Sequence, residues 1–323
     1  EDLIFFKTEI EALERELTLL HANVANDIVK KNDLNIDFIG FHGHTIYHDS
    51  NKKISKQIGD GNLLSQLCKK DVIYNFRQVD IENGGEGAPL TPIFHNAIVN
   101  KNLKNEFNKF DSINILNIGG IANITKTARW DKFYKSPDML QASDIGPGNC
   151  MIDIWIRNNS NSMFDNKGNL ASYGKTDSLI LNQALENLHI LPPYNKSLDI
   201  NDFDISFARG LNLENGASTL SDLTAEIISN AIIYYSNSQN SLSLVCGGGR
   251  KNIYLMDVIN KKLSNYNNLK LIPIEKLSID GDYIESQAFA YLAIRSFLNL
   301  PLSFPKTTRC RLPCTGGILA SNY

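Results

Sequence analysis

The sequence predicts an α/β protein with two domains, and three observations favour this fold class. The chain has 323 residues, too many for one ordinary hydrophobic core and enough for about two domains of roughly 100–200 residues each. Predicted helices and strands alternate along the chain, as they do where a sheet is parallel in part. Both halves mix strands with helices, so we expect two related α/β domains that face each other.

The first half is expected to alternate between helices and strands. An apolar stripe repeats every three or four residues from Ile10 to Ile28 and predicts a long helix over about residues 6–30. NIDFIGF is typical of a short buried strand, and its end leads into the histidine-rich stretch FHGHTIYH. After it we expect a helix from about Asn62, the strand DVIYNF, the glycine-rich loop ENGGEGAPLTP and a helix over PIFHNAIVNKNLKNEF.

The second half begins after the polar segment NKFDS at 108–112, which is the expected boundary between a first domain, 1–110, and a second, 111–323. INILNIGGIANITKT is typical of a hairpin around a Gly-Gly turn. QASDIGPGN leads into a helix that starts near Cys150, and STLSDLTAEIISNAIIYYS predicts an amphipathic helix. SLSLVC is a predicted buried strand before the glycine turn of CGGGRKN. LKLIPIEK predicts a further strand and DYIESQAFAYLAIRSFL a helix.

Composition and charge argue against nucleic acid and membrane partners and indicate a cytoplasmic protein. The chain has 32 Lys and Arg against 35 Asp and Glu, a net charge of −3, and no block of like charge, so we expect no nucleic acid partner. No apolar window is long enough to cross a bilayer, so we expect no membrane association. The five cysteines are odd in number and scattered, which indicates reduced thiols and a cytoplasmic protein.

Two groups of residues raise the question of a metal ion. FHGHTIYH, residues 41–48, holds three of the six histidines, and His42 and His44 would point the same way on an extended strand, as two zinc ligands could. Against this, the glycine between them suits a turn, and no nearby carboxylate or cysteine completes the ligand set. Cys310 and Cys314 could also supply two ligands, but no second Cys or His pair lies nearby in the sequence. We therefore expect no metal site in either place.

Two glycine-rich turns are candidates for phosphate binding. CGGGRKN follows a buried strand, so its glycines would let a ligand approach the backbone at a helix N-terminus. NIGGIAN offers N–H groups at a hairpin tip flanked by Asn117 and Asn123. Both patterns also fit ordinary turns that bind nothing.

Three charged residues are candidate site residues. Asp144 is expected at a strand end, followed by GPGN, where its carboxylate could accept a proton from water or a hydroxyl. The same carboxylate could instead satisfy local N–H groups in an Asx turn. Arg77 and Asp80 form a charged pair ahead of GGEGAP, in which Arg77 could clamp a substrate carboxylate or the two could form a structural ion pair.

Taken together, these motifs resemble those of the anhydro-N-acetylmuramic acid kinase family. They occur in the family's order and spacing over about residues 10–300, as FHGHTIYH, QIGD, FRQVDIENGGEGAPLTP, LNIGGIANIT, DIGPGN, CGGGRKN and DGDYIESQAFAYLA. The resemblance implies the sugar kinase and actin-like ATPase fold, with two ribonuclease-H-like domains around a cleft. The family normally begins with a strand and a Gly-Thr-Ser-x-x-Gly phosphate loop. The first, sugar-side domain is therefore expected to be incomplete at its N-terminus, and the second to bind the nucleotide.

The resemblance also implies a reaction. With ATP, Mg²⁺ and water, the family converts 1,6-anhydro-N-acetylmuramic acid into N-acetylmuramic acid 6-phosphate during cell-wall recycling. Asp144 is the implied base that deprotonates water for attack on the anomeric carbon, while the opened bridge oxygen takes the γ-phosphoryl group. The implied partners are ATP and an anhydro amino sugar, and the resemblance allows a homodimer. The alternative is a non-catalytic remnant that binds sugar without hydrolysing ATP, because the chain starts after the first phosphate loop.

The remaining site residues follow from the same resemblance. On the nucleotide side it implies Gly119, Gly120, Asn123, Gly247, Gly248, Gly249 and Asn252. On the sugar side it implies His42, Gly43, Thr45, Arg77, Asp80, Gly146 and Asn149. His44 stands where the family usually has glutamine, and Arg309 where it usually has glycine, so sugar-side details could differ.

Overall fold

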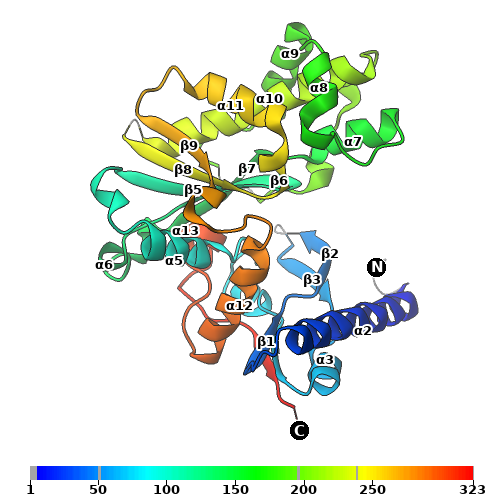
Figure 1. Ribbon diagram of the computed structural model, residues 1–323, viewed down its shortest axis with the longest axis vertical. Coiled ribbons are helices and arrows are strands. Elements are labelled where there is room, and N and C mark those ends of the chain that lie inside the picture. The colour runs from blue at the N-terminus through cyan, green and yellow to red at the C-terminus, as the bar shows by residue number, and fades with distance from the viewer. Residues whose placement is uncertain (1–5, 50–51, 195–196, 238, 323) are drawn as a thin grey trace. The chain divides into compact units, whose positions relative to one another are not determined.

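A computed structural model describes residues 6–49, 52–194, 197–237 and 239–322 (Figure 1). The chain forms two compact units. Unit 1 comprises Glu1–Phe94 with Glu285–Tyr323, and unit 2 comprises His95–Ile284. These limits differ from the expected domains, because the C-terminal segment of the chain returns to the unit that contains its first helix.

Unit 1 contains a three-stranded sheet of order β1-β4-β10. β1 (Phe38–Phe41) pairs in parallel with β4 (Asp71–Tyr74), and β10 (Ile318–Ala320) pairs antiparallel with β4. A separate antiparallel hairpin joins β2 (His44–Asp49) to β3 (Ile54–Ile58). The helices that begin in this unit or at its boundary are α2 (Lys7–Lys31), α3 (Gly61–Cys68), α4 (Gln78–Glu82), α5 (Pro92–Asn102), α12 (Ile284–Phe297) and α13 (Pro305–Thr308).

α2 confirms the predicted long helix, but its apolar stripe does not form the packed face. The buried residues of this helix are Thr18 and Ala22. Leu13, Leu20 and Val24 of the stripe are 51%, 59% and 50% exposed. The face of α2 that carries the small side chains Thr18 and Ala22 therefore packs against unit 1. The large apolar side chains of Leu13, Leu20 and Val24 remain exposed.

Unit 2 contains a five-stranded sheet of order β7-β6-β5-β8-β9. Its strands are β5 (Ser112–Ile118), β6 (Ile121–Lys126), β7 (Gln141–Pro147), β8 (Ser241–Cys246) and β9 (Leu269–Pro273). β5 and β6 form the predicted hairpin around the Gly-Gly turn. β5, β8 and β9 run parallel to one another, which confirms a sheet that is parallel in part.

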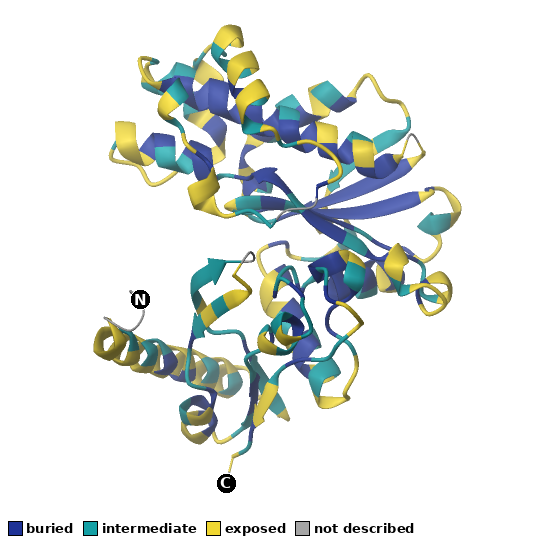
Figure 2. Ribbon diagram, turned by 180° about the vertical axis from the view of Figure 1, so that it is seen from behind, coloured by how far each residue is buried: buried dark blue, intermediate teal, exposed yellow. Residues whose placement is uncertain are grey.

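Helices pack against both faces of this sheet. Besides α5, the helices of unit 2 are α6 (Trp130–Phe133), α7 (Cys150–Asn159), α8 (Asn169–Tyr173), α9 (Ser178–Leu188), α10 (Leu213–Ser236) and α11 (Ile253–Leu263). α10 and α11 lie on one face and α5 on the other, and the strands are largely buried (Figures 1 and 2). Leu116 and Ile118 of β5 share a hydrophobic core with Ile228 of α10 and Ile259 of α11. Because side chains alternate between the faces of a strand, Asn117 belongs to the opposite face.

In the described part of the chain, every helix is too short or too polar to cross a membrane.

The buried His95 of α5 predicts a pH-dependent loss of stability. Its side chain is 2% exposed, and Nδ1 lies 2.8 Å from Thr125 Oγ1. Burial lowers its pKa from 6.5 to about 3. The folded state therefore disfavours the charged ring, and stability that is fully present above pH 6.5 is lost as the pH falls toward 3. We expect a loss of about 2 kcal/mol by about pH 5, measured by urea unfolding followed by circular dichroism.

The matched variants are His95→Gln and His189→Gln. The first removes the buried ring and should lessen the pH dependence between neutral pH and about pH 5, while the contribution of His42 remains. The second removes an exposed histidine at the end of α9 and should keep the parent's dependence. An unchanged slope in His95→Gln would contradict this assignment.

Candidate active site

A row of polar side chains crosses the sheet of unit 2 near the carboxyl ends of its parallel strands. The strand register pairs Asp144 with Asn123, Asn123 with Asn117, and Asn117 with Cys246. Cross-strand partners share a face, so this polar row lies on the face opposite α10 and α11. Ligands of open α/β sheets bind outside the carboxyl ends of the strands. The polar row is therefore placed where such a ligand would bind.

Asp144 is half-buried in β7, and a distant segment of the chain orients it. Leu198 N donates to Asp144 Oδ2 at 2.9 Å, and Ser197 Oγ donates to the same oxygen at 3.3 Å. These donors come from more than fifty residues away, unlike the neighbouring N–H groups of an Asx turn. The structure thus holds the carboxylate in a fixed orientation within the polar row.

Three glycine turns pack against one another beside the polar row. A Cβ on Gly148 would lie 2.2 Å from the carbonyl oxygen of Gly119, which accepts a hydrogen bond from Asn149 N at 2.7 Å. Gly247 has a φ of +80°, and its Cβ would lie 2.3 Å from Asn117 Oδ1. The fold itself therefore requires glycine at positions 148 and 247.

Other glycines of the same turns have room for a Cβ without a clash. The nearest atom to a Cβ would be 3.5 Å away at Gly119, 3.6 Å at Gly120 and 3.9 Å at Gly248. Chain packing does not demand glycine at these positions, but a ligand that approaches the backbone closely would. These three residues are the members of the predicted nucleotide set that are best placed to cradle phosphate.

The remaining predicted residues of unit 2 have roles inside the fold. Asn252 caps α11, with Leu255 N donating to its Oδ1 at 3.0 Å. A Cβ on Gly249 or on Gly146 would lie 2.2 or 2.5 Å from an isoleucine side chain. Asn149 Nδ2 donates to a carbonyl of β5 at 3.4 Å. Ligand contacts by these four residues stay predictions.

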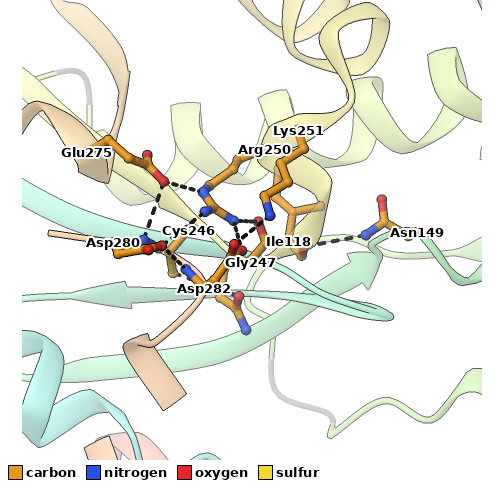
Figure 3. A network of polar contacts seen from close by, with 11 residues as sticks. Ile118, Asn149, Cys246, Gly247, Arg250, Lys251, Glu275, Asp280 and Asp282 are labelled. Carbon is orange, nitrogen blue, oxygen red and sulfur yellow. Dashed lines mark hydrogen bonds and ion pairs between the residues drawn. The ribbon is translucent and has the colours of Figure 1, made fainter. Parts of the chain in front are cut away.

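Arg250 stabilises the glycine turn at residues 246–249 through hydrogen bonds (Figure 3). Its side chain is 6% exposed, and Nη1 donates to Gly247 O at 2.8 Å and to Asp282 Oδ1 at 2.9 Å, while Nε donates to Glu275 Oε1 at 2.6 Å. Hydrogen bonds from Lys251 and Arg250 lower the pKa of Asp282. Sequence reasoning gave Arg250 no role, because its carboxylate partners lie 25 and 32 residues further along the chain.

His42, in unit 1, is neutral and joined to Arg77. Gly43 has a φ of +72°, so β1 ends before it and β2 begins at His44. The two histidines therefore do not share one extended strand. Arg77 Nε donates to His42 Nε2 at 3.1 Å, which places the ring proton on Nδ1, 3.0 Å from Gly43 O. Burial, and then the charge of Arg77, lower the pKa of His42 from 6.5 to about 4.

Within the described ranges of the chain, the histidine stretch does not gather a metal-binding group of three. His42 Nε2 accepts from Arg77, and His48 Nδ1 lies 3.1 Å from Ser55 Oγ in the β2–β3 hairpin. Among the residues that the structure describes, three ligand-type side chains converge at Asp80, Cys310 and Cys314 instead.

Thr45 and Asp80 bond to their own unit. Gln57 Nε2 donates to Thr45 Oγ1 at 3.2 Å. Asp80 is 1% exposed, and it accepts from Thr308 Oγ1 at 2.6 Å and from Gly87 N at 2.7 Å. Asp80 therefore holds the glycine loop that follows α4, and its contact with a sugar stays a prediction.

The fold and the turns define a class: α/β proteins with glycine turns at the carboxyl ends of parallel strands, an arrangement that suits phosphate groups. Comparison with known proteins narrows this class. The sequence model of the family "anhydro-N-acetylmuramic acid kinase" matches residues 7–321. The chain therefore belongs to the anhydro-N-acetylmuramic acid kinase family.

Individual relatives agree with the family match. The chain is 49% identical to the anhydro-N-acetylmuramic acid kinase of Pelagibacter ubique (strain HTCC1062), over 98% of this chain and 82% of that relative. It is 38% identical to the kinase of that name from Zymomonas mobilis, over 94% and 79% of the two chains. The corresponding protein of Brucella canis is 37% identical over 96% and 80%.

Gly247→Ala and Gly248→Ala should differ sharply in stability. The first places a Cβ in a left-handed backbone conformation and against Asn117, and should cost about 2–4 kcal/mol. The second places a Cβ 3.9 Å from Asn149 Nδ2, an ordinary van der Waals distance, and should change the unfolding free energy by less than about 0.5 kcal/mol. Urea unfolding of the two variants measures both values. Equal destabilisation would show that Gly248 is also a packing residue.

Proposed function

We propose that this protein transfers the γ-phosphoryl group of ATP to 1,6-anhydro-N-acetylmuramic acid with the addition of water. Water attacks the anomeric carbon, the bond from that carbon to the bridging 6-oxygen breaks, and the 6-oxygen takes the phosphoryl group. The products are N-acetylmuramic acid 6-phosphate and ADP. Family membership supports the kinase class, and the orientation of Asp144 beside open glycine turns is the observation that carries the proposal.

Asp144 is the proposed general base. It removes a proton from water as the oxygen attacks, and a positioned carboxylate of this kind typically contributes 10²–10⁴-fold to the rate. The hydrogen bonds from Leu198 and Ser197 both fall on Oδ2, so they fix the carboxylate plane before substrate binds. Fixing this geometry beforehand avoids an ordering cost during the reaction.

The open glycines fit the phosphates of ATP. Gly119, Gly120 and Gly248 leave room for a ligand at the backbone, and the turns that carry them are fastened by Gly148 and Arg250. Mg²⁺ supplies charge neutralisation on the phosphates, and it would be held mainly by the nucleotide and water.

Arg77 is the proposed sugar-side contact in unit 1. The substrate carries a carboxylate, which the planar guanidinium group can bind through two hydrogen bonds. His42 accepts from Arg77 Nε and is itself neutral, so it orients Arg77 without competing for the substrate's negative charge. The proposal places this step in cytoplasmic cell-wall recycling and includes a homodimer, both on the family likeness alone.

Asp144→Asn should abolish most of the turnover without loss of ATP binding. The amide keeps the shape of the carboxylate but cannot accept the proton, so kcat should fall by about 10²–10⁴-fold. A coupled assay of ADP release with the anhydro sugar measures it. Asp153→Asn, a half-buried carboxylate of α7 outside the polar row, is the matched control and should retain activity.

Two results would contradict the proposal. Equal rates in Asp144→Asn and the parent would remove Asp144 from the role of base. Sugar binding by calorimetry without any ADP release from the parent protein would favour the non-catalytic sugar-binding alternative.

Gly248→Ala and Gly120→Ala should weaken ATP binding while leaving the fold intact. Each Cβ would occupy space that is open to a ligand, and we expect the Kd for ATP to rise by roughly tenfold, equivalent to about 1.4 kcal/mol. Isothermal titration calorimetry with ATP and Mg²⁺ measures the change, and Asp144→Asn serves as the variant with unaltered affinity. Unchanged ATP affinity in both glycine variants would exclude these turns as the phosphate cradle.

A further inference from the structure

Three side chains that commonly bind metals meet in unit 1, outside the polar row. Asp80, Cys310 and Cys314 each place one ligand atom within 4.8 Å of the others. Cys314 Sγ lies 3.8 Å from Asp80 Oδ1. Asp80 is 1% and Cys310 2% exposed, while Cys314 is partly exposed. The cluster is therefore buried, with one member accessible from solvent.

Main-chain contacts fix the positions of these ligands. Cys314 and Ser303 form an antiparallel bridge, with Cys314 N donating to Ser303 O at 3.2 Å. Arg311 N donates to Asn83 O at 3.1 Å, which ties the cysteine segment to the loop that follows Asp80. The ligand atoms are thus held together by the fold before any ion binds.

We propose that Asp80, Cys310 and Cys314 bind one Zn²⁺ ion. Tetrahedral Zn²⁺, with bonds of about 2.3 Å to sulfur and about 2.0 Å to oxygen, separates these ligands by roughly 3.5 Å. The 3.8 Å between Cys314 Sγ and Asp80 Oδ1 is close to this value. On binding, both thiols release their protons to solvent, two Zn–S bonds and one Zn–O bond form, and a water molecule takes the fourth position.

The cluster suits zinc better than a disulfide or a hard cation. Two thiolates select a thiophilic ion over Mg²⁺. A disulfide would use only the two sulfurs, and it forms by attack of an accessible thiolate, whereas Cys310 is almost fully buried. Zinc uses all three ligands and needs only the partly exposed side at Cys314 as an entrance.

Basic side chains at the neighbouring glycine loop offset the ligand charge. Two thiolates and a carboxylate carry three negative charges against the two positive charges of the ion. Lys53 Nζ donates to Gly84 O at 2.5 Å and to Gly85 O at 3.2 Å. Arg311 Nε would lie 3.4 Å from a Cβ on Gly84. The anionic zinc complex would therefore lie beside two cationic side chains.

The ion would crosslink two segments that are distant in sequence. Asp80 lies in α4, and Cys314 follows it by 234 residues. An ion that binds only the folded chain stabilises it by mass action, so zinc would stabilise unit 1 and order the loop beside Asp80. This role does not depend on the phosphoryl transfer proposed above.

The test measures metal content, spectroscopy and stability of the whole chain. We expect protein purified without chelator to contain one zinc ion per chain. Replacement by Co²⁺ should give a thiolate-to-metal charge-transfer band and the intense visible bands of a tetrahedral site. Removal of zinc should lower the midpoint of thermal unfolding by several degrees, and adding Zn²⁺ back should restore it.

Cysteine variants assign the ligands. Cys310→Ser and Cys314→Ser should each weaken Zn²⁺ binding by at least about 100-fold, more than loss of an outer partner causes. Cys68→Ser removes a lone buried thiol and should leave zinc binding unchanged. If the ligand variants do not fold, alkylation of the parent chain gives the same test, because Zn²⁺ should protect Cys314 from reaction.

Three results would overturn the proposal. The first is equal zinc affinity in the parent and Cys314→Ser. The second is equal alkylation of Cys314 with and without Zn²⁺. The third is a Cys310–Cys314 disulfide in the purified protein that, once reduced, takes up no Zn²⁺.

Discussion

The carboxyl edge of the five-stranded sheet depends on the close approach of one backbone segment to another. Gly148 lies against the carbonyl group of Gly119, and Gly247 against Asn117, at separations where any side chain would collide. This contact brings the turns after β5, β7 and β8 together, and with them the polar row. Arg250 then locks the outermost turn by donating to the carbonyl of Gly247. The positions of Asp144 and of the open glycines follow from that packing.

Positive charge near the predicted site residues is controlled in opposite ways in the two units. In unit 2, the buried guanidinium of Arg250 is balanced by surrounding carboxylates, so it serves the fold and adds little net field for an anionic ligand. In unit 1, His42 is neutral because its pKa is lowered to about 4. It therefore adds no second positive charge beside Arg77. A positive charge that is retained in this way can be directed at a substrate carboxylate.

Local patterns in the sequence were enough to predict the long helix α2, the β5–β6 hairpin and the helix after DIGPGN, because each depends on periodicity or turn residues within a short window. Long-range pairing was not predictable in the same way. The return of β10 to β4, the carboxylates around Arg250, and the meeting of Asp80 with Cys314 all join segments far apart in sequence. For the same reason, the sequence alone did not indicate Asp80 as a third ligand beside Cys310 and Cys314. The ligand-binding roles of the site residues stay predictions, because the fold fixes the positions of these side chains and not the identity of a ligand.

The exposed stripe of α2 affects how this chain behaves in solution. Leu13, Leu20 and Val24 present contiguous apolar surface to water, and such patches promote association between molecules. Sulfate and phosphate salts strengthen that attraction, so salting-out should begin at modest concentrations. Dyes such as ANS, which fluoresce on apolar surface, should bind the native chain and raise the baseline of a dye-based melting curve. Circular dichroism does not respond to this surface and is the more suitable probe of unfolding.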